Sequence, residues 1–142
     1  MFRSALNYYA AVKSSTMSFV ELFEDLAKYI DTEQSRWKFA LRLKRGYADT
    51  GVPGGLYKDQ CYLEGAVNFL QERKNIDIEG LFCGKISLED LKKPKIQKII
   101  NKDKDTISFP PFCSDWDAYL KALDHIAETN LISTNPAEAS DA

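Results

Sequence analysis

A glycine-rich loop with a lysine beyond each end is the part of this sequence whose residue types best suit binding chemistry. Residues 46–57 contain four glycines and one proline, and Lys44 and Lys58 lie just outside them. A glycine-rich loop that leads into a helix N-terminus presents free backbone N–H groups, which attract anions. The G-x-x-x-x-G-K-[ST] pattern of a nucleotide-binding loop is absent. An anion site and an ordinary connecting loop are therefore the two hypotheses.

Lys44 differs from the other basic residues of the helix predicted for residues 32–45. Lys38, Arg42 and Arg45 share one side of that helix, which is typical of a solvated basic face. Lys44 instead projects into the apolar arc, and a buried cation needs a partner. Two interpretations stay open: the side chain reaches solvent from the helix end, or its charge is held for an anionic ligand.

Lys58 and Tyr62 are four residues apart and so lie on one face of the next predicted helix. We predict that Lys44, Arg45 and Lys58 converge on one concave site. A ligand carboxylate would relieve the repulsion among these cations, because Arg and Lys bind carboxylates through charge-assisted hydrogen bonds. The alternative to a ligand site is a structural role, in which turns and ion pairs of the loop residues fix the shape of the loop. The loop residues in question are Gly46, Asp49, Thr50, Pro53, Gly54 and Asp59.

The single histidine, His125, limits the catalytic chemistry open to this chain. Ser-His-Asp or Cys-His catalysis would have to run through this residue, and a zinc site with two histidine ligands is excluded within the chain. Cys61, Cys83 and Cys113 are far apart and lack the C-x-x-C spacing of a zinc finger. We interpret them as small buried hydrophobes in a reducing compartment, with a disulfide or a reactive thiol as the alternative.

The composition is that of a folded globular segment. The 142 residues are 44% hydrophobic and 12% aromatic, with a formal net charge of −2. This charge favours neither nucleic acid nor membrane binding, and no apolar run approaches the roughly 18 residues that a membrane helix needs. We therefore expect neither as a partner. The six lysines of residues 92–104 are interpreted as a solvated surface, with a docking patch for an acidic partner as the alternative.

Helical periodicity dominates the chain. Apolar residues from Phe19 to Ile30 recur at i, i+3, i+4, i+7, i+8 and i+11, which is typical of a helix that faces a core. Ser18 and Glu21 form a capping box at its start. Other helices are expected over about residues 3–13, 32–45 and 58–73, and from Ser87 and Ser114 onward, with Pro94 as an interruption.

These patterns predict an all-α fold of five or six helices with a Gly-rich loop. The candidate extended stretch is short and runs from about Leu81 to Ile86. Residues 1–132 are expected to form one helical region, as the C-terminal part of a larger domain. The small, acidic residues 133–142 are expected to be a disordered tail.

The densest set of distinctive residues lies between positions 36 and 65. It consists of Arg36-Trp37, Arg42, Lys44-Arg45-Gly46, Asp49-Thr50, Pro53-Gly54, Lys58-Asp59-Gln60 and Tyr62-Leu63-x-Gly65. The strings Met17 to Leu26, Gly84 to Asp90 and Leu123 to Asn130 extend it over nearly the whole chain. Together these strings resemble the microtubule-associated tyrosine carboxypeptidase family, which is related to a bacterial group with a Gln-Glu-Gly-Leu-Ala motif.

The resemblance implies the C-terminal portion of a zinc metallopeptidase that removes a C-terminal tyrosine or other aromatic residue, typically from α-tubulin. In that family a His-Glu-x-x-x-His helix and a later glutamate hold the zinc, and these ligands precede the equivalent of Leu6. The metal is therefore expected in a missing N-terminal catalytic part, and the substrate is an acidic, tubulin-like C-terminal tail. The substrate-binding residues expected on this basis are Lys44, Arg45, Lys58 and Tyr62.

Two functional interpretations follow. In the first, the chain supplies substrate-side residues to the carboxypeptidase and is inactive until it is joined to the catalytic part. In the second, it is a non-catalytic helical module that binds a partner protein, or a truncated inactive paralogue. The resemblance implies a cytoplasmic location and an association with microtubules.

The purified chain is expected to bind no stoichiometric zinc and to hydrolyse no peptide by itself. The reason is its lack of a zinc ligand set, since it has one histidine and three dispersed cysteines. Metal analysis after dialysis tests this expectation, and one tightly bound zinc per chain would show it to be wrong.

Overall fold

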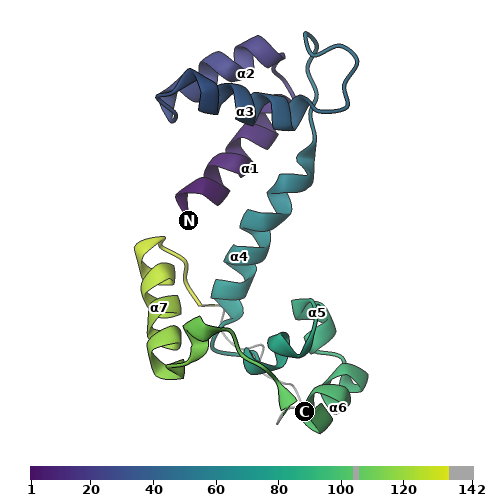
Figure 1. Cartoon of the computed structure of the whole chain (residues 1–142), viewed down its shortest axis with the longest axis vertical. Helices are drawn as coiled ribbons and strands as arrows, with labels where there is room; N and C mark the ends of the chain where they lie inside the picture. Colours follow the sequence, from purple (N-terminus) through teal and green to yellow (C-terminus); the bar gives the residue numbers. More distant parts are fainter. Residues whose placement is uncertain (104–105, 135–142) are drawn as a thin grey trace. The chain divides into compact units, whose positions relative to one another are not determined.

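The computed structural model describes residues 1–103 and 106–134, and for residues 101–103 it describes the backbone alone. Within this part of the chain the fold is all-α, as predicted, with seven α-helices and no strand (Figure 1). The helices are α1 (Phe2–Ser14), α2 (Phe19–Asp25), α3 (Glu33–Lys44), α4 (Gln60–Glu72), α5 (Leu88–Leu91), α6 (Pro94–Asp103) and α7 (Trp116–Thr129). Short 3-10 helices span Leu26–Lys28, Tyr57–Asp59, Glu79–Cys83 and Pro111–Cys113.

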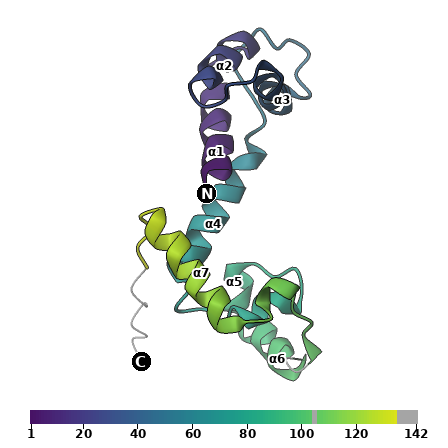
Figure 2. The ribbon, with the colours of Figure 1, turned by 60° about the vertical axis from the view of Figure 1, so that its left-hand side comes forward.

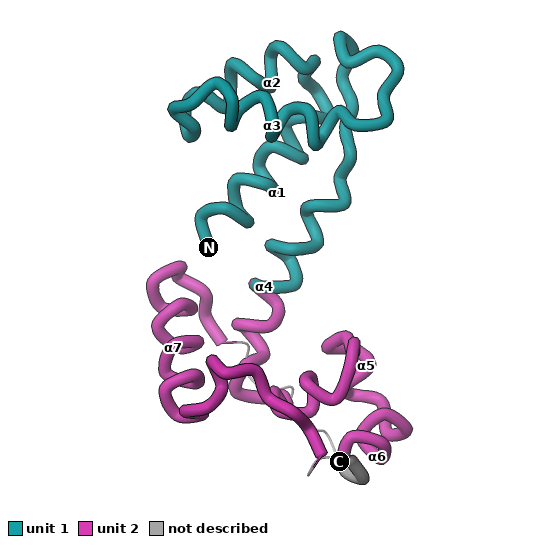
Figure 3. The backbone as a smooth tube through the Cα atoms, viewed as in Figure 1, with its two compact units in different colours: residues 1–66 teal, residues 67–142 magenta. Residues whose placement is uncertain are grey.

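The chain divides into two compact units, residues 1–66 and residues 67–142 (Figure 3). Helix α4 begins in the first unit and ends in the second. The single helical region expected for residues 1–132 stays a prediction. The tail expected for residues 133–142 lies outside the described residues from position 135 onward.

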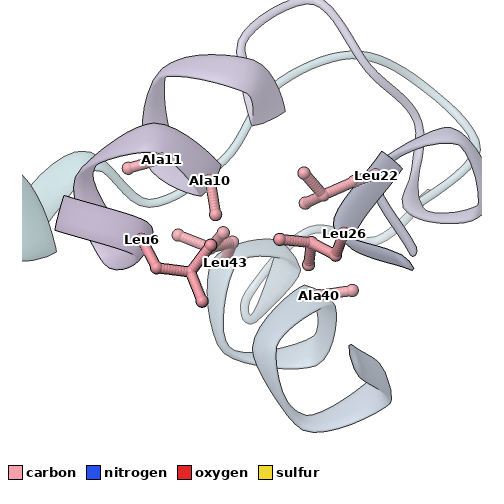
Figure 4. Packing of buried hydrophobic residues seen from close by; sticks show 7 residues of the cluster. All are labelled: Leu6, Ala10, Ala11, Leu22, Leu26, Ala40 and Leu43. Carbon is pink, nitrogen blue, oxygen red and sulfur yellow. The ribbon is translucent and has the colours of Figure 1, made fainter. Parts of the chain in front are cut away.

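Unit 1 is built around a core shared by α1, α2 and α3 (Figure 4). The core residues are Leu6, Ala10, Ala11, Leu22, Leu26, Ala40 and Leu43. The predicted capping box starts α2: the Ser18 hydroxyl accepts from the Glu21 N–H, and the Glu21 carboxylate accepts from the Ser18 N–H at 2.7 Å. The cap satisfies two N–H groups that the helix itself leaves unpaired, so α2 begins where the sequence predicts.

Helix α6 is the additional helix, and Pro94 begins it rather than interrupting a helix. Proline is tolerated in the first turn because that N–H has no partner within the helix. The N–H groups of Ile96 and Gln97 both donate to the Lys93 carbonyl, which completes the start of α6. From the sequence, Pro94 is expected to interrupt a helix, whereas this proline is the first residue of one.

The prediction of an extended stretch from Leu81 to Ile86 is wrong, because its first residues belong to the 3-10 helix Glu79–Cys83. The Asp77 carboxylate accepts from the Gly80 N–H at 3.1 Å and supports this turn. Such local bonds from Asp side chains favour turns over extended backbone.

The predicted N-cap of the last helix is also wrong by one residue. Ser114 has helical dihedral angles and ends the preceding 3-10 helix, whereas an N-cap has extended angles. Asp115 has these extended angles, and its carboxylate accepts from the Ala118 N–H at 2.9 Å. Asp and Ser cap helices about equally well, so residue type alone did not distinguish them.

Unit 2 contains the end of α4 and the helices α5, α6 and α7 (Figure 2). It is held together by an ion pair and an aromatic cluster. The Arg73 side chain is buried; its Nε donates to Asp124 on α7 at 2.7 Å, and its Nη1 donates to the Leu70 carbonyl. Phe82 and Trp116 pack together with a centroid separation of 6.5 Å. The ion pair connects the end of α4 to α7, and the aromatic contact connects the 3-10 helix Glu79–Cys83 to α7.

Replacing Leu22 by alanine is expected to destabilise unit 1 by about 2–5 kcal/mol, because the side chain is fully buried and its removal leaves a cavity. Val20 on the same helix is 61% exposed, so Val20→Ala is the matched control. Urea unfolding followed by circular dichroism measures both variants. Equal losses in the two variants would contradict the described core.

Candidate functional site

The loop at residues 45–56, between α3 and α4, is tied to the beginning of the chain by backbone hydrogen bonds. The Gly54 N–H donates to the Ser14 carbonyl at 2.8 Å, at the end of α1. The Phe19 N–H donates to the Thr50 carbonyl, also at 2.8 Å, at the start of α2. Since both ends of the α1–α2 turn bind the loop, the loop has a defined path.

The side chain of Lys44 lies inside this arrangement and is only 1% exposed. Its Nζ donates to the Met17 carbonyl, and to the Val52 carbonyl at 2.9 Å. Burial lowers the pKa of Lys44, and the nearby Glu21 carboxylate opposes this effect. The interpretation that this side chain reaches solvent is therefore wrong, and two of its three N–H donors serve backbone carbonyls of the turn and the loop.

Three of the loop glycines have a steric reason to be glycine. Gly46 has a φ of +90° directly after α3, and this left-handed conformation is typical of a helix C-terminus. Gly54 has a φ of +127°, and a Cβ there would meet the Tyr47 ring at 2.8 Å. At Gly55 a Cβ would collide with the Ser14 side chain. The close approach of the loop to α1 thus depends on small residues.

Two aspartates of the predicted loop set have structural partners. The Asp59 carboxylate is paired with the Arg42 guanidinium through both oxygens, with an Nη2–Oδ1 distance of 2.9 Å. This pair connects α3 to the residue before α4 and raises the pKa of Arg42. The Asp49 carboxylate accepts from the Gly51 N–H at 2.8 Å and so forms an Asx turn, in agreement with the expectation that local turns fix the shape of the loop.

The other predicted site residues lie at the surface. Arg45, Lys58 and Tyr62 are exposed. Lys44 lies in the interior of the unit. The convergence of Lys44, Arg45 and Lys58 on one ligand stays a prediction.

A groove between α1 and α3 was not predicted from the sequence. It has a volume of about 260 Å³ and is lined by Arg3, Asn7, Ser35, Lys38, Phe39 and Arg42. A signal was present, because the α1 residues are spaced i, i+4 and the α3 residues i, i+3, i+4, i+7, which places each set on one helix face. From the sequence alone, Lys38 and Arg42 are interpreted only as part of a solvated basic face.

The described residues contain no group of three or more His, Cys, Asp or Glu side chains arranged to hold a metal ion. His125 is exposed. The interpretation of all three cysteines as buried is wrong for Cys61, which is exposed in the first turn of α4 and donates to the Lys58 carbonyl. Cys113 is buried, as expected, and burial raises its pKa.

None of the described helices combines the length and the apolar character needed to cross a membrane.

Comparison with known proteins now defines the class. The profile of the microtubule-associated tyrosine carboxypeptidase family matches residues 10–133. This chain therefore belongs to the microtubule-associated tyrosine carboxypeptidase family.

Several relatives show the extent of the similarity. Microtubule-associated tyrosine carboxypeptidase 1 of Rattus norvegicus is 39% identical over 131 residues, which cover 92% of this chain and 27% of the rat protein. The Homo sapiens protein of the same name is 38% identical with the same coverage. MATCAP2 of Mus musculus is 38% identical over 92% of this chain and 24% of the mouse protein. The chain thus spans about a quarter of the length of these curated relatives.

Replacing Lys44 by methionine is expected to destabilise the chain by about 1–3 kcal/mol, because it leaves two carbonyls without their donor. The loop at residues 45–56 should also be cut faster in limited proteolysis. Arg45→Met removes the neighbouring, exposed cation and serves as the control. The anchoring role fails if the two variants unfold at the same urea concentration and are cut at the same rate.

Proposed function

We propose that this chain forms the substrate-side part of a carboxypeptidase that removes a C-terminal tyrosine or other aromatic residue from an acidic protein tail of the tubulin type. The observation that carries the proposal is the similarity over 92% of the chain to proteins named tyrosine carboxypeptidases. Their names also support an association with microtubules for the protein that contains this chain, and we propose a cytoplasmic location for it.

The chemistry of the loop region supports this assignment. A carboxypeptidase has to bind a terminal carboxylate, and an exposed Arg or Lys does so through charge-assisted hydrogen bonds. Arg45 and Lys58 are exposed cations on either side of the loop, and Tyr62 offers a phenol O–H. Donors of this kind also stabilise the oxyanion that develops at the attacked carbonyl. Arg45 begins the loop that Lys44 holds, and Lys58 lies in the 3-10 helix that follows it, so the anchored loop would keep these two donors in place.

The zinc of the proposed enzyme does not fit the residues described here, because they include no group of metal-binding side chains. We therefore assign the metal ligands to the part of the protein that the curated relatives have and this chain does not cover. The proposal for this chain concerns the binding and orientation of the substrate.

A second candidate function is a helical module that binds a partner without catalysis, as in an inactive paralogue. A pocket of about 460 Å³ in unit 2 favours it, with Trp116, Leu120 and Leu123 beside the buried Arg73. This volume is within the range of about 300–1,000 Å³ that is usual for ligand sites. Tyrosine release by the longer protein separates the two candidates, because a binding module releases none.

In a protein that joins this chain to an N-terminal catalytic part of the family, Lys58→Ala is expected to lower kcat/KM by about 10-fold or more. The expectation follows from the loss of one charge-assisted hydrogen bond to the substrate. Lys95 is an exposed lysine of α6, so Lys95→Ala is the control and should leave the rate unchanged. Tyrosine released from a peptide with a C-terminal tyrosine is measured. Equal rates in the two variants would remove Lys58 from the substrate site.

A further inference from the structure

We propose that the groove between α1 and α3 binds glutamate or aspartate side chains of an acidic peptide upstream of its C-terminus. This inference rests on the proposed function, since it deepens the description of the substrate that the carboxypeptidase recognises. It assigns residues that lie outside the predicted loop site. The two residues that carry it are Arg3 on α1 and Lys38 on α3.

The groove has a fixed floor and walls. Helices α1 and α3 pack against each other through the buried Leu6 and Leu43 (Figure 4). The groove volume of about 260 Å³ is below the range of about 300–1,000 Å³ typical of whole small-molecule ligands. A groove of this size suits one or two side chains of an extended peptide.

The charge of the groove is positive and partly uncompensated. Arg42 is neutralised by Asp59. Arg3 and Lys38 line the same groove, and neither has an ion-pair partner among the described residues, while no lining residue is acidic. Two like charges in one groove repel each other, and a carboxylate between them would turn repulsion into attraction. The groove is thus complementary to an anion although the chain as a whole has a net charge of −2.

The neutral lining residues favour oxygen ligands. Asn7 offers an amide, and the Ser35 hydroxyl accepts from the Thr32 hydroxyl at 2.8 Å, so its own O–H remains able to donate. The Phe39 ring forms an apolar wall for the methylene groups of a glutamate side chain. A nucleic acid is a poorer fit, because its binding depends on a row of phosphate contacts that so small a groove does not provide.

The groove also adjoins the predicted substrate residues. Arg42 lines the groove and at the same time pairs with Asp59, one residue before α4. Asp59 directly follows Lys58 in the sequence. A peptide lying in the groove would therefore pass from Lys38 along Arg42 towards the segment that carries Lys58.

The test measures binding of a fluorescent peptide with six glutamates and a C-terminal tyrosine to the full 142-residue chain at low salt. Lys38→Glu and Arg3→Glu are each expected to weaken binding about 10-fold or more, and Lys38→Arg should keep it. Lys121 is exposed on α7 in unit 2, so Lys121→Glu is the charge-matched control. Replacing the six glutamates by glutamines should abolish binding. Circular dichroism checks that each variant keeps its helices.

The proposal is overturned if the glutamate peptide does not bind, or if Lys38→Glu and Lys121→Glu weaken binding equally. It is also overturned if single-stranded RNA binds more tightly than the peptide in a manner that depends on Lys38. Activity of the longer protein separates this proposal from the proposed function. If the longer protein releases tyrosine equally from the glutamate and glutamine peptides, the proposal for the groove is refuted and the proposed function stands. If the glutamate peptide binds through the groove but no tyrosine is released, the proposed carboxypeptidase function is refuted and the groove proposal stands.

Discussion

Unit 1 depends on the burial of one ammonium group, that of Lys44. A charge without water needs hydrogen-bond acceptors, and the carbonyls of Met17 and Val52 are the acceptors available. Both carbonyls have to approach the same nitrogen, so the α1–α2 turn and the glycine-rich loop are forced together. The small residue Gly55 makes the approach possible, because any side chain there would collide with Ser14.

Three of the four cations of helix α3 act in three different ways, and this division organises the surface of unit 1. Lys44 faces the interior and orders the loop. Arg42 pairs with Asp59 and connects α3 to the residue before α4. Lys38 faces the groove beside Arg3 and has no ion-pair partner among the described residues. One helix thus contributes a structural charge, a connecting charge and a charge available to a ligand.

A partly exposed ion pair is weak evidence for stability by itself, since solvent screens the attraction. The pairs in this chain matter more for geometry. Arg73 and Asp124 link the end of α4 to α7 in unit 2, as Arg42 and Asp59 link α3 to the residue before α4 in unit 1. In each unit the cation bridges segments that are distant in the sequence, which gives the exposed residues nearby a defined position.

The sequence by itself determined the all-α class, the capping box at Ser18 and the family, because helical periodicity and local side-chain bonds depend on near neighbours. It also singled out Lys44 as a cation in an apolar arc. Only the tertiary structure decided what that cation binds, since its acceptors Met17 and Val52 are 27 and 8 residues away. The spacing of the residues places each set of groove residues on one face of its own helix, but the groove of Arg3 and Lys38 exists only through the packing of α1 on α3.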